Sequence, residues 1–145
     1  MATRILVVND TQDILEMFRL LLEAEGYEVV VSSFPLEDIF EIEKLNLDLI
    51  ILDVVFGQEK IGWQMLQLLK MNPSTASLPI IICSAAQDTV KEQEGYLVSK
   101  DVLVVYKPFE LEDLLQTISQ ALDAHKHRLS QLEKKKGLHT KNDNK

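Results

Sequence analysis

Five short apolar runs alternate along the chain with longer stretches in which apolar and polar residues are mixed. The runs cover residues 5–8, 28–32, 49–52, 80–83 and 102–105. Four of them are nearly continuous in Ile, Leu and Val, a composition typical of strands that are covered on both faces. The pattern therefore predicts a parallel sheet with helices on each side.

The stretches between the runs carry helix signals. Apolar residues recur every three or four positions over residues 11–25, and Gly26 follows where a left-handed cap is favourable. Pro35 can open a second helix, since proline suits the first helical position. The remaining helices are expected over residues 62–71, over roughly 88–99, and from Leu111 onward. Because crossovers between parallel strands are right-handed, this (βα)5 order predicts an α/β fold with a doubly wound sheet.

The size and the charge of the chain indicate one domain followed by a tail. At 145 residues and 46% hydrophobic, the chain can bury one ordinary core. Residues 126–145 hold seven Lys or Arg against two acidic residues, a charge of +5, so the net charge of −8 leaves −13 on residues 1–125. We expect residues 1–125 to form the domain and residues 126–145 a basic C-terminal tail, a helix extension that then becomes disordered. The acidic domain would repel nucleic acid and anionic membranes, so neither is an expected direct partner.

The apolar segments bear on location and redox chemistry. The chain does not start with a basic segment followed by an apolar stretch, and no uninterrupted apolar run is long enough to span a bilayer. This pattern predicts a soluble, cytoplasmic protein. Cys83 is the single cysteine and lies within an apolar run, which excludes an internal disulfide and a multi-cysteine metal site.

One apolar stripe runs along the last predicted helix. Its members, spaced alternately four and three residues apart, are Leu111, Leu115, Ile118, Leu122, His125, Leu129 and Leu132. The stripe fits two arrangements. In the first it packs on the sheet, and the helix frays after about Leu122 because no core remains to be covered. In the second it continues as a short coiled coil that joins two chains into a homodimer.

Polar residues follow the ends of four predicted strands. Asn9 and Asp10 follow the first strand, Asp53 the third, Ser84 the fourth and, one residue on, Lys107 the fifth. In an open parallel sheet, ligands bind beyond the carboxyl ends of the strands, so these side chains should meet at one edge. Each residue alone is commonly a cap or a turn residue, and Asp10 could merely cap the first helix. The set as a whole indicates a site.

The chemistry of this set is coherent. Two close carboxylates repel each other unless a cation lies between them, and an oxygen-rich, negative cluster suits a hard divalent ion such as Mg²⁺. A carboxylate beside the ion can attack phosphorus to form an aspartyl phosphate, while a lysine and a hydroxyl bind other phosphoryl oxygens. Asp53 ends the central strand, within reach of the others, and is the candidate nucleophile.

Four segments carry a resemblance to a known family. They are ILVVND, DLIILD ending at Asp53, IIICSA containing Ser84, and YKPF containing Lys107. In this order and near these separations they resemble the receiver domain of bacterial two-component response regulators, which has the fold of the chemotaxis receiver. The resemblance covers about residues 3–122. It implies a flavodoxin-like three-layer sandwich with a parallel five-stranded sheet of order 2-1-3-4-5.

The resemblance assigns roles to individual residues. Asp53 resembles the phosphoacceptor, Lys107 the phosphoryl-binding lysine and Ser84 the switch hydroxyl. Asp10 resembles the direct Mg²⁺ ligand of the family's acidic pair, and Val55 would lend the metal its backbone carbonyl. The family also implies a cis peptide bond between this lysine and the proline that follows it.

The chain departs from the family pattern at several of these positions. The first residue of the acidic pair is Asn9, which removes a negative charge and leaves a weak or water-mediated metal ligand. The switch aromatic, three residues before the lysine, is Val104. Two positions that assist hydrolysis in the family are Val55 and Ala86, neither of which can orient a water, so we expect slow self-dephosphorylation.

The leading hypothesis is a single-domain response regulator, a signalling phosphoacceptor that catalyses only its own Mg²⁺-dependent phosphorylation and dephosphorylation. A sensor histidine kinase or a histidine phosphotransfer protein would phosphorylate Asp53. Phosphorylation would shift the face made by the fourth helix, the fifth strand and the fifth helix, and a downstream protein would bind there. The alternative is a pseudo-receiver, an interaction module that works without phosphorylation, with Asn9 and Val104 as signs of lost chemistry.

An enzyme on a similar sheet is a third hypothesis. Phosphatases with an aspartyl nucleophile commonly place a second acid two residues later, and that position is Val55. A flavodoxin-like carrier needs a phosphate-binding loop after the first strand, where the segment NDTQD would instead repel a phosphate. Both patterns argue against this hypothesis.

Overall fold

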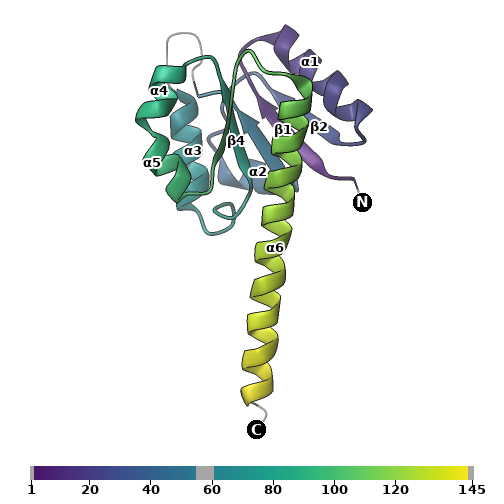
Figure 1. Cartoon of the computed structure of the whole chain (residues 1–145), viewed down its shortest axis with the longest axis vertical. Helices are drawn as coiled ribbons and strands as arrows, with labels where there is room; N and C mark the ends of the chain where they lie inside the picture. The colour runs from purple at the N-terminus through teal and green to yellow at the C-terminus, as the bar shows by residue number, and fades with distance from the viewer. Residues whose placement is uncertain (1, 55–60, 144–145) are drawn as a thin grey trace.

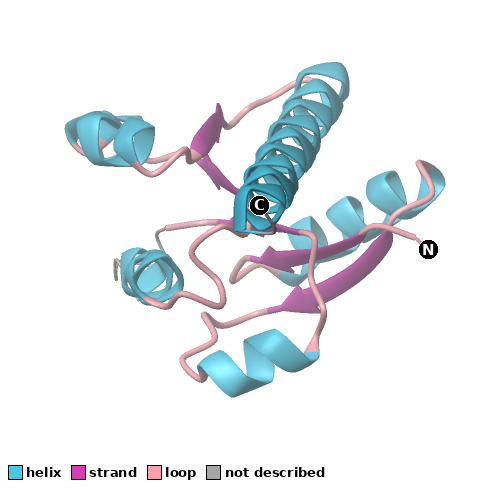
Figure 2. Cartoon of the chain, turned by 90° about the horizontal axis from the view of Figure 1, so that it is seen from below, coloured by secondary structure: helices cyan, strands magenta, loops and turns pink. Residues whose placement is uncertain are grey.

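The computed structural model describes residues 2–54 and 61–143, with side chains as far as residue 131. In this part of the chain, a five-stranded sheet lies between two layers of helices (Figure 1 and Figure 2). The strands are β1 (Arg4–Val8), β2 (Glu28–Ser32), β3 (Leu49–Leu52), β4 (Ile80–Ser84) and β5 (Leu103–Tyr106). All neighbouring strands are parallel, in the order β2-β1-β3-β4-β5, which confirms the predicted flavodoxin-like topology.

The helices cover both faces of this sheet. They are α1 (Gln12–Ala24), α2 (Ile39–Lys44), α3 (Ile61–Met71), α4 (Gln87–Glu92), α5 (Glu94–Ser99) and α6 (Leu111–Asp143). Because successive strand residues point to opposite faces, each strand contributes to two cores. Leu6 and Ile50 belong to the core beneath α2, α3, α4 and α5, whereas Ile5 and Ile51 belong to the core beneath α1 and α6. The unalternated apolar runs are therefore strands covered on both sides, as predicted.

Two predicted helices differ from the structure. The second helix begins at Ile39, not near Pro35, because the carboxylate of Asp38 caps it by accepting a hydrogen bond from the N–H of Phe40 at 2.9 Å. The predicted fourth helix is divided into α4 and α5. The backbone of Gln93, at φ −101° and ψ 10°, leaves the helical region between them.

Other predicted features agree closely with the structure. Gly26 has a φ of 91° after α1, in the left-handed region expected of a cap. Strand β5 lies one residue later than predicted, so Lys107 follows it directly. None of the helices in the described part of the chain is long and apolar enough to cross a membrane.

Helix α6 projects far beyond the sheet (Figure 1). It has 33 residues and reaches Asp143, well past Leu122, where the first of the two arrangements considered from the sequence has the helix fray. The segment lacks proline and is rich in Lys, Leu and Gln, which favour helix. Its contacts with the domain also continue past Leu122, because Arg128 forms an ion pair with Asp101 at 3.0 Å. Within the stripe, Ile118 is buried and Leu129 is 44% exposed.

Candidate functional site

The carboxyl ends of the strands bring the predicted site residues to one edge of the sheet. The hydrogen-bonded ladder continues one residue beyond three strands, so the backbone N–H groups of Asn9, Asp53 and Lys107 donate to the carbonyl oxygens of Ser32, Val8 and Ser84 at 3.1, 3.1 and 2.9 Å. Ser84 is itself the last residue of β4. These backbone bonds fix where each side chain starts.

Asp53 lies at the centre of the site. Its side chain is 11% exposed, and its Oδ2 accepts a charge-assisted hydrogen bond from Nζ of Lys107 at 3.1 Å. The same oxygen accepts a hydrogen bond from Nδ2 of Asn9 at 3.2 Å. The structure therefore joins three of the predicted residues directly, with two donors on one carboxylate oxygen.

Asn9 is buried, and its amide is used at both ends. The nitrogen donates to Asp53, and the oxygen accepts a hydrogen bond from the backbone N–H of Thr11 at 2.9 Å. An ionised carboxylate can only accept and a backbone N–H can only donate, so this orientation of the amide is the one that satisfies both neighbours. The oxygen that the sequence suggested as a weak metal ligand is turned toward the start of α1.

Asp10 is exposed at the end of β1, where its Oδ1 accepts a hydrogen bond from Oγ1 of Thr11 at 3.3 Å. The N-cap residue of α1 is Thr11, whose own side chain makes no capping hydrogen bond.

The donors at this edge fit a hard cation. Asp10 and Asp53 supply two carboxylates, which suits an ion such as Mg²⁺ that keeps several of its waters. Val55, the expected backbone ligand, lies outside the described residues. In the part of the chain that the structure describes, no group of three or more His, Cys, Asp or Glu side chains is placed to hold a metal. Among the described residues, the candidate metal ligands at this edge are the carboxylates of Asp10 and Asp53.

Ser84 is buried, and its Oγ accepts a hydrogen bond from the backbone N–H of Ala86 at 3.1 Å. Its hydroxyl proton is left to donate in another direction. Beside it on β4, burial raises the pKa of the Cys83 thiol to about 11, although the nearby ammonium of Lys107 lowers it. Cys83 is therefore a neutral packing residue and not a nucleophile.

Gly62 is a site residue that the sequence reasoning missed. A Cβ at this position would lie 2.3 Å from the carbonyl oxygen of Asp53 and 2.5 Å from Cα of Val54. Only glycine lets α3 start this close to the backbone that carries the phosphoacceptor candidate. One indication of this role was present in the sequence: Gly62 is the first residue of a predicted helix, although glycine has a low helix propensity.

The edge strand β5 carries the position of the expected switch aromatic. Val104 is half-buried there and lines a surface hollow of about 560 Å³ together with Tyr106 and Phe109. Nζ of Lys91 on α4 lies 5.9 Å from the centre of the Tyr106 ring, a cation–π contact. The peptide bond between Lys107 and Pro108 is cis, as the family resemblance implied.

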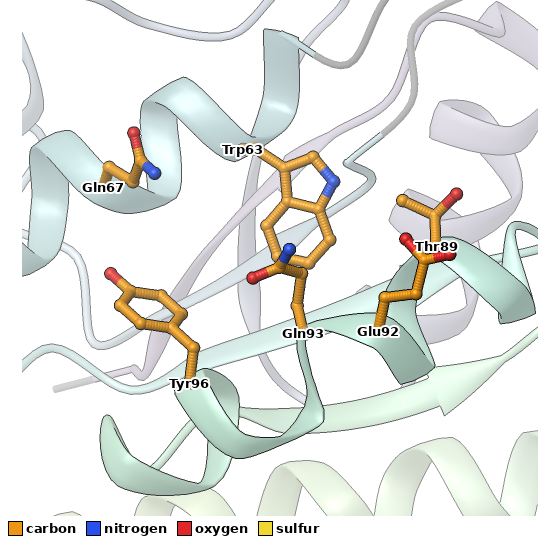
Figure 3. A pocket seen from close by; sticks show the side chains of 6 residues that line it. All are labelled: Trp63, Gln67, Thr89, Glu92, Gln93 and Tyr96. Atoms are coloured by element: carbon orange, nitrogen blue, oxygen red, sulfur yellow. The ribbon is translucent and has the colours of Figure 1, made fainter.

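A separate cavity of about 200 Å³ lies between α3 and the α4–α5 pair. Figure 3 shows the residues that line it, which are Trp63, Gln67, Thr89, Glu92, Gln93 and Tyr96. None of them belongs to the set at the strand ends. Trp63 is the single tryptophan of the chain and follows Gly62 directly, so its fluorescence can report changes near Asp53.

Known proteins resemble this chain in sequence and in fold. The response regulator receiver domain family matches residues 5–119. The uncharacterized transcriptional regulatory protein YbdJ of Bacillus subtilis is 31% identical over 84% of this chain and 52% of its own length. Response regulator ArlR of Staphylococcus saprophyticus is 32% identical over 83% of this chain and 52% of its own length. The chain thus spans about half the length of these relatives.

Solved structures give the same result. The chemotaxis protein CheY4 of Vibrio cholerae superposes on this chain with a TM-score of 0.71 at 27% identity. The superposition covers 84% of this chain and 100% of that protein. The similarity therefore extends over a whole domain and is not limited to the strand-end motifs.

Proposed function

Because the chain belongs to the response regulator receiver domain family, we propose that Asp53 accepts a phosphoryl group from a phosphohistidine. The donor is a sensor histidine kinase or a histidine phosphotransfer protein of a two-component phosphorelay. One observation carries the proposal: Asp53 is buried at the end of the central strand, with Lys107 held against its carboxylate at 3.1 Å. A buried carboxylate paired with a lysine at the carboxyl edge of a parallel sheet is placed to receive an anionic group.

The transfer is a substitution at phosphorus. A carboxylate oxygen of Asp53 attacks, the bond between phosphorus and the histidine nitrogen breaks, and the imidazole leaves with the bonding electron pair. Lys107 stabilises the charge that builds up on the phosphoryl oxygens, and the hydroxyl proton of Ser84 is free to donate to one of them. Receiver domains generally bind Mg²⁺, which supplies further positive charge to the phosphoryl group; Asp10 and Asp53 would hold it here.

The signal leaves through protein binding. The predicted binding face was the fourth helix, the fifth strand and the fifth helix. In the structure these are α4 with α5, β5 and α6. Strand β5 is an edge strand of the sheet, and Val104 and Tyr106 are only half-buried on it. Phosphorylation draws the Ser84 hydroxyl toward the new charge and biases this face toward the form that a downstream protein binds. Ala86 cannot orient a water, so the phosphorylated state is long-lived.

The proposal also covers the location of the protein, its domain bounds and its partners. We place it in the cytoplasm, within a receiver unit of residues 1–125, whose net charge of −13 disfavours direct contact with nucleic acid or anionic membranes. Residues 126–145, with a charge of +5, form a basic tail, the described part of which continues α6 and contacts the domain through Arg128. A homodimer through α6 would use the part of the stripe that the domain does not cover, such as the exposed Leu129.

A specific observation favours a second candidate function. Asn9 donates to Asp53, so the site is internally paired without an acidic residue at this position. A receiver fold paired in this way can serve as an interaction module that works without phosphorylation.

Intact mass separates the two functions. The chain is incubated with Mg²⁺ and acetyl phosphate, beside an Asp53→Ala variant and an Asp13→Ala variant that removes an exposed carboxylate on α1. We expect a gain of one phosphoryl group in the unaltered chain and in Asp13→Ala, and none in Asp53→Ala. No gain at high Mg²⁺ in a folded sample would refute phosphorylation and support the interaction module.

A further inference from the structure

The bond between Asn9 and Asp53 is buried. Asn9 is 3% exposed, and its Nδ2 lies 3.2 Å from Oδ2 of Asp53. Nζ of Lys107 lies 3.1 Å from the same oxygen. The carboxylate therefore receives an amide N–H and an ammonium on one oxygen, in a place where little water reaches it.

An acidic residue at position 9 would reverse the sign of this contact. The side chains of Asn and Asp have the same shape, so an aspartate would bring a carboxylate oxygen to about the same distance from Oδ2 of Asp53. Two buried carboxylates in contact repel each other strongly unless a cation or a proton lies between them. With aspartate the site would set two carboxylates against the single ammonium of Lys107 and would need a further cation; with Asn9 the amide N–H supplements that ammonium instead.

We propose that Asn9 is a positioning residue that locks Asp53 in a metal-free resting state. Its amide takes over part of the neutralisation that a cation would supply, so the apo site is stable and Mg²⁺ must compete with the amide for the charge of the same carboxylate. The use of this lock rests on the proposed function of Asp53, but the lock itself does not require phosphoryl transfer. The result is a receiver whose resting state is nearly insensitive to Mg²⁺.

The oxygen of the same Asn9 amide connects the site to the start of α1. Oδ1 of Asn9 accepts the N–H of Thr11 at 2.9 Å, just before α1 begins at Gln12. If a cation at Asp53 draws the amide oxygen toward itself, this hydrogen bond breaks. Metal occupancy is thereby coupled to the first turn of α1, and the backbone amide of Thr11 is the atom that reports it.

Thermal unfolding of an Asn9→Asp variant tests the lock. The full chain and the variant are melted in EDTA and in saturating Mg²⁺, with Asn46→Asp as a control that adds the same charge on an exposed turn at the other end of the sheet. In EDTA we expect Asn9→Asp to melt on the order of 5 °C below the unaltered chain, and Mg²⁺ to restore most of the loss. Mg²⁺ should raise the Tm of the unaltered chain and of Asn46→Asp by much less than it raises the Tm of Asn9→Asp.

An Asn9→Ala variant removes the amide without adding a negative charge, so it tests whether the amide competes with Mg²⁺ for Asp53. Mg²⁺ affinity is measured by calorimetry and by the fluorescence of Trp63. If the amide competes with the ion, Asn9→Ala binds Mg²⁺ several-fold more tightly than the unaltered chain, although it has gained no negative charge. Equal or weaker binding by Asn9→Ala, or a Tm of Asn9→Asp in EDTA equal to that of the unaltered chain, would overturn the lock.

These readouts are independent of phosphorylation. If Asp53 is never phosphorylated but the melting and binding pattern holds, the lock stands and the proposed function falls. If Asp53 is phosphorylated and the pattern fails, the proposed function stands without the lock. A backbone amide signal of Thr11 that shifts with Mg²⁺ in the unaltered chain supports the coupling to α1, and an unchanged signal at saturating Mg²⁺ refutes it.

Discussion

The two ends of the sheet carry ion pairs of almost equal length in different surroundings. At the carboxyl end, Lys107 and Asp53 are 3.1 Å apart, and their side chains are 18% and 11% exposed. At the amino end, Arg128 and Asp101 are 3.0 Å apart, but their side chains are 41% and 70% exposed. Water screens the second pair more strongly than the first, so the first pair contributes more to stability at the same distance.

This difference in exposure predicts how substitutions affect stability at each end of the sheet. Lys107 and Asn9 both donate to one carboxylate oxygen of Asp53, so removing either donor affects the other. At the amino end, α6 contacts the domain through Arg128, which pairs with Asp101, and through His125, whose pKa is lowered in part by the charge of Arg128. Substitutions should therefore be costly at the first end, where the groups are buried, and mild at the second, where they are exposed.

The largest expected effect comes from the backbone under Asp53. Gly62→Ala forces a Cβ against the carbonyl oxygen of Asp53 and should destabilise the chain by about 1–3 kcal/mol, the usual cost of overpacking. Gly95→Ala is the matched control, since a Cβ there meets nothing within 4 Å. It should be neutral or stabilising by up to about 1 kcal/mol, because alanine favours helix. Urea unfolding measures both, and equal effects would show that the close approach at Gly62 does not matter.

The ion pairs themselves come next. Lys107→Met leaves a mostly buried carboxylate with one donor fewer and should cost about 2 kcal/mol, less than for a fully buried pair because the site is partly wet. Arg128→Met should cost no more than about 0.5 kcal/mol, since its pair is exposed. Urea unfolding at low and high salt checks both, and only the exposed pair should weaken with salt. Equal losses in the two variants would contradict the contrast between the ends.

The smallest effect concerns His125. Burial, and then the charge of Arg128, lower the pKa of His125 from 6.5, while Asp48 and the backbone of Ser77 raise it. Glu43 lines the same hollow. Because the folded pKa lies below the unfolded value, the stability contributed by neutral His125 is complete above pH 6.5 and is lost as the pH falls toward the lower folded value.

A substitution isolates this pH dependence. His125→Gln should flatten the stability profile between about pH 5 and about pH 7. Urea midpoints across this range are the measurement. A slope that survives in His125→Gln would assign the dependence to another group.

The sequence was most informative where one physical signal dominates. Buried parallel strands need unbroken branched apolar residues, so the runs at β1, β3 and β4 could be located within one residue. The converging strand ends then made Asp53, Ser84 and Lys107 predictable as neighbours. These inferences need only the period of the pattern and the geometry of the sheet.

The remaining features depend on competition between local signals or on contacts in three dimensions. The sequence predicted a helix start at Pro35, whereas the carboxylate of Asp38 caps the helix and sets its start at Ile39. The amide orientation of Asn9 is set by two neighbours, Thr11 and Asp53, the second of which lies far along the chain. The anchoring of α6 by Arg128 requires the position of Asp101 in space.

The central claim is that Asp53 is the phosphoacceptor, and locating the phosphoryl group tests it most directly. The chain is treated with acetyl phosphate and Mg²⁺, the acyl phosphate is reduced with borohydride, and the modified residue is found by peptide mass spectrometry. We expect the modification at Asp53 and at no other acidic residue, with Asp10 unmodified. Modification of a different carboxylate, or none in a folded sample, would contradict the account.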